Sequence, residues 1–239
     1  VAASRGMSPN EKALYTNSTL AMNPQTGKIL WFFQHIQGET IDMEVGFERI
    51  LADIDDKKLL LTIGKDGILW KLDREKGNFI DLKETINQNI YKKVDRNKGK
   101  VVYRDDILLS KIDTPFSACP GIYGGHNWQA VSYDPESYLM VIPLHQLCAD
   151  MIGRYVERKE GGGGYGANSR NYKMDNTNGN VGKLVTIDIK NMEKIWQYEQ
   201  DAMFLTGSLS TAGGLTFIGD LDRKFMGFDT KTGKLLWDT

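Results

Sequence analysis

The sequence lacks long hydrophobic runs and an initial methionine. None of its 239 residues forms part of a run approaching the roughly 18 consecutive apolar residues that a membrane helix needs. The longest apolar piece is short, at residues 29–33 (ILWFF). Val1 is not followed by the basic and apolar regions of an export signal. We therefore expect a protein that does not span a membrane, with any signal peptide removed or outside this chain.

An excess of charge of either sign is also missing. The chain carries 30 Lys and Arg against 31 Asp and Glu, a formal net charge of −1. Because no long-range field favours a polyanion, nucleic acid is not expected as a partner. With 41% hydrophobic and 26% charged residues, the composition is typical of a folded globular protein and excludes disorder.

Cysteine and helix signals are scarce. Cys119 and Cys148 are too few for a disulfide scaffold, and no CxxC motif or nearby His pairing indicates a zinc site. The 25 glycines and 10% aromatic residues instead indicate many short strands joined by turns.

Three segments share one pattern, in which a strand ends in Asn or Asp, passes through a turn and reaches a Trp eight residues later. They are residues 23–31 (NPQTGKILW), 188–196 (DIKNMEKIW) and 229–237 (DTKTGKLLW). Residues 72–77 (LDREKG) keep the turn without the Trp, and residues 131–139 (VSYDPESYL) are a further candidate unit.

Each unit is predicted to be a β-hairpin. The Asn or Asp side chain can cap the turn, and Gly27, Gly77 and Gly233 supply the positive φ that such turns require. Units recurring at roughly 40 to 60 residues are typical of four-stranded propeller blades. We therefore predict an all-β protein, a β-propeller with four-stranded antiparallel blades.

Two stretches outside the repeats, residues 86–118 and 149–182, are expected to be irregular. The second contains four consecutive glycines, residues 161–164, without the GK[ST] of a phosphate loop. Two interpretations of this run stay open. It is either a flexible loop or a backbone segment that approaches a flat ligand closely.

The repeats resemble the tryptophan-docking motifs of the pyrroloquinoline quinone (PQQ) dependent alcohol and methanol dehydrogenases. Four blocks carry the resemblance: residues 14–21 (LYTNSTLA), 64–74 (GKDGILWKLDR), 124–129 (GGHNWQ) and 210–222 (STAGGLTFIGDLD). It extends from about Tyr15 to the C-terminus. The resemblance implies an eight-bladed, periplasmic propeller of which this chain is a part.

Lys65 lies in the block where this family places a Lys or Arg beside the quinone. The resemblance implies that Lys65 donates to the ortho-quinone oxygens, where negative charge develops during hydride transfer. A turn between two strands can aim such a cation into the central channel of a propeller. The alternative is a solvated lysine in a Lys-Asp-Gly turn.

Asn127 and Trp128 resemble the family's Asn-Trp pair that contacts the cofactor. The Asn127 amide offers both a donor and an acceptor to a planar polar ligand, and Trp128 is expected to pack beside it. Without the resemblance, the pair would be interpreted as a loop residue followed by a core aromatic.

The 29-residue separation of Cys119 and Cys148 is similar to that of a structural disulfide in methanol dehydrogenases. The resemblance therefore implies that these cysteines pair, which in turn implies an oxidising compartment. Two buried free thiols are the alternative.

Asp42 is the candidate catalytic base. In the family an aspartate follows a Trp about eleven residues before a Leu-Ala-Asp segment. Here Ile41 replaces that Trp and residues 51–53 (LAD) follow. The resemblance implies that Asp42 removes the alcohol proton, and that Asp42 and Glu44 help to hold Ca²⁺ or a lanthanide. Both acids could instead be exposed loop residues.

The function implied is that of a quinoprotein dehydrogenase, an oxidoreductase that oxidises an alcohol by hydride transfer to PQQ. Electrons would pass to a periplasmic cytochrome c type acceptor. A non-catalytic PQQ-like propeller scaffold is the alternative, but it has no reason to keep Asp42, Lys65 and Asn127 together. A sugar dehydrogenase using the same cofactor is a third hypothesis.

The length of the chain limits the number of propeller blades it can form. At roughly 40 to 60 residues per blade, residues 1–239 amount to about four to five blades of one propeller, too few to close an eight-bladed ring. We therefore expect a fragment that is inactive alone and binds the cofactor poorly, with the signal peptide of the periplasmic protein outside it.

Overall fold

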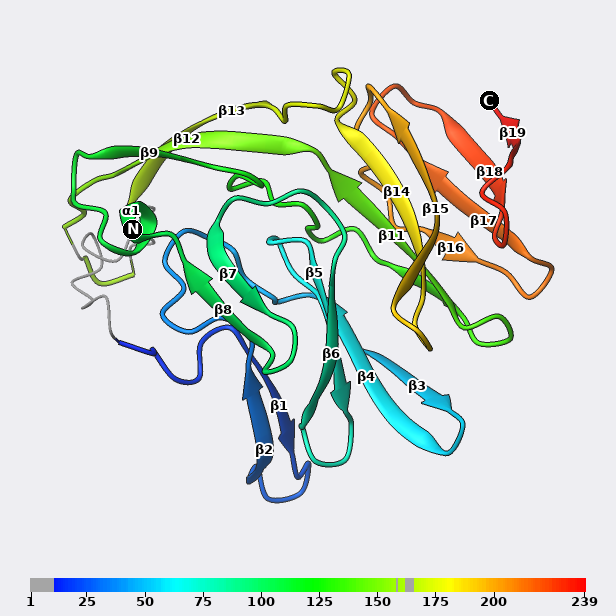
Figure 1. Cartoon of the computed structure of the whole chain (residues 1–239), viewed down its shortest axis with the longest axis horizontal. Helices are drawn as coiled ribbons and strands as arrows, with labels where there is room; N and C mark the ends of the chain where they lie inside the picture. Colours follow the sequence, from blue (N-terminus) through cyan, green and yellow to red (C-terminus); the bar gives the residue numbers. More distant parts are fainter. Residues whose placement is uncertain (1–10, 158, 162–165) are drawn as a thin grey trace.

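Strands form nearly all of the regular structure in the computed structural model, which describes residues 11–157, 159–161 and 166–239 (Figure 1). Gly162, Gly163 and Gly164 of the glycine run lie outside the described residues. The elements are β1 (Ser18–Met22), β2 (Ile29–Gln34), β3 (Ile50–Ile54), β4 (Lys57–Ile63), β5 (Ile68–Asp73), β6 (Phe79–Glu84), β7 (Tyr91–Asp95), β8 (Lys100–Tyr103), α1 (Asp105–Leu108), β9 (Pro115–Ala118), β10 (Ser132–Asp134), β11 (Leu139–His145), β12 (Leu147–Gly153), β13 (Ala167–Lys173), β14 (Gly182–Asp188), β15 (Glu193–Gln200), β16 (Leu209–Ser210), β17 (Leu215–Gly219), β18 (Phe225–Asp229) and β19 (Leu235–Asp238).

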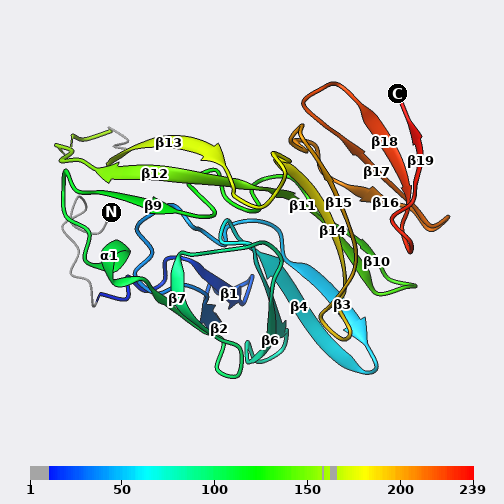
Figure 2. The ribbon, with the colours of Figure 1, turned by 45° about the horizontal axis from the view of Figure 1, so that its top comes forward.

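Three antiparallel sheets of four strands follow one another along the chain. Their strand orders are β3-β4-β5-β6, β10-β11-β14-β15 and β16-β17-β18-β19. The β1–β2 hairpin precedes them, and the sheets succeed each other around an arc in two views (Figures 1 and 2). This arrangement confirms the prediction of an all-β, partial propeller with four-stranded antiparallel blades.

The Asn or Asp of each repeat caps its turn, as predicted. The side-chain oxygens of Asn23, Asp73, Asp188 and Asp229 each accept a hydrogen bond of 2.8–3.1 Å from the backbone N–H two residues later. These turns join β1 to β2, β5 to β6, β14 to β15 and β18 to β19. The same local chemistry therefore recurs between the last two strands of successive sheets.

Two further turns differ from the expectation. Asp134 caps the turn between β10 and β11, the first two strands of the sheet whose last turn is capped by Asp188, so this unit adds no further sheet. Asp95 caps a turn that the repeat pattern did not predict, and a Cβ on Gly99 in that turn would lie 2.4 Å from Phe79. Phe79, six residues after Asp73, thus contacts this turn as Trp31 and Trp196 contact the turns at Gly77 and Gly233.

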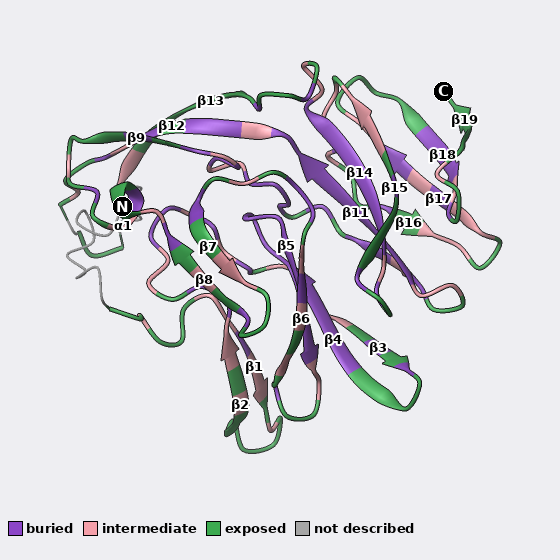
Figure 3. Cartoon of the chain, in the orientation of Figure 1, coloured by how far each residue is buried: buried purple, intermediate pink, exposed green. Residues whose placement is uncertain are grey.

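The expectation that residues 86–118 and 149–182 are irregular is wrong. The first stretch contains β7, β8, α1 and β9, and the second contains most of β12 and all of β13. β9, β12 and β13 form a three-stranded sheet with β12 in the middle. Six of the seven residues of β13 are exposed (Figure 3), so its sequence lacks the alternation that indicates a strand.

The main core lies between neighbouring sheets. Strands β4, β5, β11 and β14 are buried along most of their length (Figure 3). Leu61 and Leu69 of one sheet share a core cluster with Ile142 and Val185 of the next. Burial of these apolar faces holds adjacent blades together. No helix in the described part of the chain is long and apolar enough to cross a membrane.

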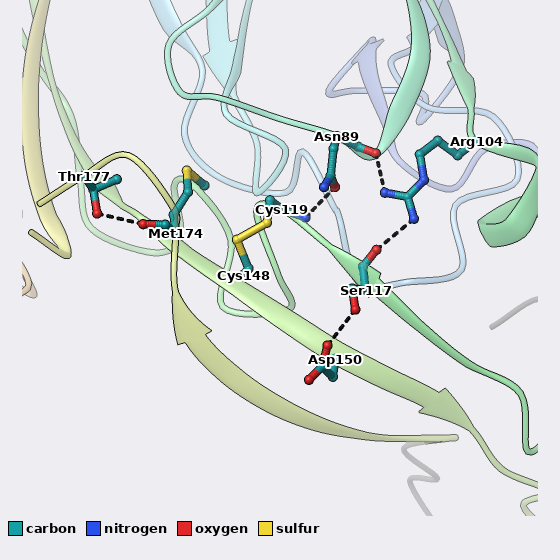
Figure 4. Close-up of a disulfide and its surroundings, with 8 residues drawn as sticks. All are labelled: Asn89, Arg104, Ser117, Cys119, Cys148, Asp150, Met174 and Thr177. Carbon is teal, nitrogen blue, oxygen red and sulfur yellow. Dashed lines mark hydrogen bonds between the residues drawn. A yellow bond between two sulfur atoms is a disulfide. The ribbon is translucent and has the colours of Figure 1, made fainter. Parts of the chain in front are cut away.

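Cys119, just after β9, and Cys148, in β12, form a disulfide (Figure 4), which excludes the free-thiol alternative. The backbone N–H of Cys119 donates to Oδ1 of Asn89 at 2.8 Å. Arg104 donates to the carbonyl oxygens of Asn89 and Ser117, at 2.7 and 2.9 Å. The disulfide and these bonds join the segment after β6 to the β9–β12 pair.

Candidate functional site

Lys65 lies in the tight turn between β4 and β5, the two central strands of the first four-stranded sheet. The turn is closed by a 2.9 Å hydrogen bond from the N–H of Gly67 to the carbonyl oxygen of Gly64. The Lys65 side chain is only 8% exposed. Lys65 is therefore not a solvated turn lysine.

Two carboxylates contact the Lys65 ammonium. Nζ lies 2.9 Å from Oδ2 of Asp42 and 2.8 Å from Oε1 of Glu44. Burial alone would lower the pKa of Lys65, but the hydrogen bonds and charges of Glu44 and Asp42 outweigh it and hold the pKa above its usual value. The structure thus joins three of the residues predicted from the sequence.

Alternating burial presents these acids on one side of their loop. Ile41 and Met43 are buried in the core, whereas the side chains of Asp42 and Glu44 are 38% and 39% exposed. Both carboxylates are therefore ion-paired and still open to a ligand from solvent.

Glu39, which the sequence did not single out, holds the Asp42 backbone in place. Its Oε1 accepts hydrogen bonds from the N–H groups of Ile41 and Met43, at 2.5 and 3.0 Å. The residue between them, Asp42, has a φ of 72°, in the left-handed region that costs non-glycine residues energy. The two bonds flank the strained residue and fix its conformation.

The Gly124-Gly125 segment packs directly on the Lys65 turn. Gly125 donates its N–H to the Lys65 carbonyl at 2.6 Å, and a Cβ on Gly124 would lie 2.6 Å from Cγ of Lys65. Two of the four sequence blocks therefore meet at a place where only glycine backbone fits.

Asn127 is buried three residues after Gly124, and its amide is partly used within its own loop. Nδ2 donates to the carbonyl oxygen of Tyr123 at 2.9 Å, and Oδ1 accepts from the N–H of Trp128 at 3.0 Å. One amide hydrogen and one lone pair remain available. Trp128 is 59% exposed, so it is not a core aromatic. Within the described ranges, no hydrogen bond or ion pair links either residue to Lys65.

A buried acid lies directly beside Lys65. Asp66 accepts hydrogen bonds from the N–H of Ile68 at 3.0 Å and from the hydroxyl of Tyr91 at 3.1 Å. Burial raises the pKa of Asp66 to about 7, against the effect of those two bonds. Sequence reasoning missed Asp66 because Asp-Gly in a turn indicates a solvated residue, and no local pattern indicates its contact with Tyr91.

Three buried polar side chains lie in or near the Gly124 block without full hydrogen bonding. His126 and His145 each use one ring nitrogen on a backbone carbonyl, and both amide atoms of Gln129 lack a partner in the described structure. Burial lowers the pKa of both histidines to about 4, so they are neutral at pH 7.

These features fit a planar ligand that carries carbonyl and carboxylate oxygens. Lys65 and Asn127 supply donors, and Gly124 and Gly125 leave backbone without side chains at the Lys65 turn. For a metal ion, Asp42 and Glu44 supply two hard oxygen ligands. The part of the chain that the structure describes contains no group of three or more His, Cys, Asp or Glu that could hold a metal.

Comparison with known proteins identifies the fold family. The PQQ family described as "Glucose/ethanol/alcohol dehydrogenase, beta-propeller domain" matches residues 4–85 and 79–239, nearly the whole chain. The chain belongs to this family. The resemblance stated from the sequence is thus confirmed.

Curated members of the PQQ family resemble the chain over most of its length. The quinohemoprotein alcohol dehydrogenase of Comamonas testosteroni is 29% identical over 94% of the chain, which covers 33% of that protein. The lanthanide-dependent methanol dehydrogenase of Methylacidiphilum fumariolicum is 27% identical over 91% of the chain, covering 36% of that protein. The chain therefore spans about a third of the length of these relatives.

Solved structures of the PQQ family share the fold. A europium-containing methanol dehydrogenase superposes with a TM-score of 0.87 at 25% identity, covering 94% of this chain and 40% of that one. The quinohemoprotein alcohol dehydrogenase of Comamonas testosteroni gives a TM-score of 0.85 at 25% identity, covering 100% of this chain and 37% of that one.

Proposed function

We propose that the protein carrying this chain is a PQQ-dependent dehydrogenase that oxidises an alcohol. The observation that carries the proposal is the buried Lys65 ammonium, which lies between the carboxylates of Asp42 and Glu44. Lys65 belongs to one of the sequence blocks that resemble the PQQ family, within the residues that the family matches. A scaffold without chemistry gains little from such a cluster, because burying an ammonium costs free energy.

Each residue has a distinct role in the proposal. PQQ, when bound, supplies the acceptor for the alcohol's hydride. Lys65 donates hydrogen bonds to the quinone oxygens and stabilises the charge that develops there. Asp42, open to solvent and next to Lys65, accepts the proton of the alcohol hydroxyl. Asn127 contributes its free amide hydrogen and lone pair to the cofactor, and the exposed Trp128 ring packs beside it.

Asp42 and Glu44 are also the proposed ligands for Ca²⁺ or a lanthanide. Their carboxylate oxygens suit both ions. Both acids already pair with Lys65, so the metal and the ammonium share the same carboxylates. Further ligands must come from elsewhere in the protein, since two carboxylates do not complete the coordination of either ion.

The setting of the proposed enzyme is the periplasm. The Cys119–Cys148 disulfide supports an oxidising compartment. A cytochrome c type protein is the proposed electron acceptor, since two similar proteins are named "Lupanine 17-hydroxylase [cytochrome c]" and "1-butanol dehydrogenase (cytochrome c)". We also propose that residues 1–239 are four to five blades of one propeller domain, inactive without the rest of it.

The test is reconstitution of the full-length protein with PQQ and either Ca²⁺ or a lanthanide, followed by reduction of an artificial electron acceptor on addition of primary and secondary alcohols. We expect alcohol-dependent reduction, and sugars serve as the comparison substrates. If PQQ fails to bind with either metal, the enzyme proposal is wrong and the scaffold alternative is favoured. Activity with sugars alone would favour the sugar dehydrogenase.

A further inference from the structure

A groove of about 620 Å³ lies between two neighbouring sheets. It borders the Lys65 turn, because Thr85, one of its lining residues, donates its hydroxyl to the carbonyl oxygen of Gly67. Its walls include Lys83 of β6, Lys183 of β14 and Lys194 of β15, and its apolar part includes Val185 and Ile187 of β14. Both walls belong to complete four-stranded sheets of this chain.

Strand register places the three lysines on the faces that form this groove. Lys83 pairs with Leu69 in the β5–β6 ladder, and Leu69 belongs to the same core cluster between the two sheets as Val185. Lys183 lies two residues before Val185 on β14, and therefore on the same face. Lys194 pairs with Ile187, which shares that face. The three lysines thus line one inter-sheet space.

Lys183 is largely buried and ion-paired with Glu199, but it makes no hydrogen bond in the described structure. It is 9% exposed, and the carboxylate it meets, Glu199, lies 3.8 Å from its Nζ, beyond hydrogen-bond distance. Nearby Lys71, also buried, donates to the carbonyl oxygens of Ile189 and Lys190 at 2.8 and 2.9 Å. Over the described residues, the Lys183 Nζ makes no such bond. The ammonium is not sealed from solvent and therefore keeps hydrogen-bond donors for a further acceptor.

The charge around Lys183 favours an anion. Among the lining residues of the described structure, Glu84 is the only acid, and the side chain of Gln88 already donates to it. Glu199, outside the lining, offsets part of the positive charge at Lys183. Lys194 donates to the amide oxygen of Gln197, a neutral group. Desolvation by burial also lowers the pKa of Lys183, an effect that a bound anion would offset.

We propose that this groove binds a small anion that carries two or more charged oxygens, of carboxylate or phosphate chemistry. Lys183 contacts it from the floor, and Lys83 and Lys194 contact it from the rim. The proposal does not depend on PQQ or on alcohol oxidation.

Titration calorimetry of the full-length protein without PQQ, at low ionic strength, tests the proposal. Citrate and pyrophosphate are the two probes, and their relative affinities distinguish a carboxylate ligand from a phosphate ligand. We expect one saturable site for at least one probe. Lys183→Met should weaken binding about 10-fold or more, and Lys83→Met or Lys194→Met about 3- to 10-fold each, as expected for charge-assisted hydrogen bonds.

Lys76→Met is the matched control, because Lys76 is exposed in the β5–β6 turn and lies outside the groove. It should leave the affinity within about twofold of the wild type, since a distant exposed charge is screened. Absence of saturable binding for both probes would overturn the proposal. So would equal weakening in Lys76→Met and the groove variants. If Lys183→Met does not fold, the two rim variants decide the result.

Discussion

The Trp196 ring lies where a side chain of residue 233 would begin: a Cβ on Gly233 would come within 2.4 Å of the indole. The indole N–H also donates to the carbonyl oxygen of Thr230 at 2.8 Å, in the same turn. Trp31 of the β1–β2 hairpin and Gly77 of the β3–β6 sheet repeat the relationship, again at 2.4 Å. The Trp of one hairpin thus docks on the glycine turn of a following sheet, which explains why the repeat requires both residues.

Gly233→Ala and Gly77→Ala should each destabilise the fold more than Gly27→Ala. All three glycines have a φ near 70°, so each alanine would be held in left-handed backbone, which destabilises the fold by about 1–2 kcal/mol. Only Gly233 and Gly77 also place the new methyl group against an indole, which should add about 1–3 kcal/mol, whereas Gly27 has nothing within 4 Å. Urea unfolding measures the three free energies, and equal losses would exclude docking as the cause.

Removing the disulfide should lower the free energy of unfolding by about 3–4 kcal/mol, from the loop entropy of a 29-residue separation. The variant Cys119→Ala/Cys148→Ala should therefore unfold at lower denaturant concentration than the oxidised protein. Thiol counting under denaturing, non-reducing conditions is the direct check of the bond. Two free thiols per chain in freshly purified protein would refute the pairing.

Local sequence patterns could predict the structural features that depend on contacts between residues close together in the sequence. The capped turns at Asn23 and Asp229 depend on bonds to the next three residues. The docked Trp196 follows from its place in the same repeat. In contrast, the contact between Asp66 and Tyr91 joins residues 25 positions apart, and neither residue's neighbours indicate that both are buried.

Part of the candidate site was predicted from resemblance to a family and not from local sequence patterns. Lys65, Asp42 and Glu44 came from resemblance to a family, and the structure brings their side chains together. Glu39 carries no recognisable motif, because one acid in a polar segment is usually an exposed residue. Its role depends on the fold of the loop after β2.

Lys65→Ala should lower alcohol turnover by about 10²-fold or more in the PQQ-reconstituted full-length protein, since a buried donor aimed at developing charge is lost. Lys58→Ala is the matched control, because Lys58 pairs with Glu75 at an exposed site. Steady-state rates with saturating alcohol compare the two. An unchanged rate in Lys65→Ala would remove Lys65 from the site.

Glu39→Ala should loosen the Asp42 loop, whereas Glu39→Gln should largely preserve it. The amide oxygen of Gln can accept hydrogen bonds from the N–H groups of Ile41 and Met43, as the Glu39 carboxylate does. Ala has no such acceptor, so both N–H groups lose their hydrogen bond to residue 39. Hydrogen exchange at these two amides should accelerate about 5- to 160-fold in Glu39→Ala, for a loss of about 1–3 kcal/mol. Unchanged exchange in Glu39→Ala would show that other contacts hold the loop.

In the wild type, Asp66 should lower the free energy of unfolding as the pH rises from 4 to 7, and Asp66→Asn should abolish this decrease. The pKa of Asp66 is raised from 3.8 to about 7 by burial, so between these values the folded protein keeps a proton that the unfolded chain has released. The free energy of unfolding contributed by Asp66 therefore falls as the pH rises through this window and is constant above it.

The amide introduced by Asp66→Asn cannot titrate, so the stability of this variant relative to the wild type should increase from pH 4 to pH 7.5. The buried histidines His126 and His145 produce the opposite slope, because their lowered pKa values make the unfolded chain bind more protons between about pH 4 and 6.5. That slope is common to both proteins and cancels in the difference. Urea unfolding of both proteins across this pH range measures the difference between their free energies of unfolding. A difference that does not change with pH would show that Asp66 is ionised in the folded protein at acid pH.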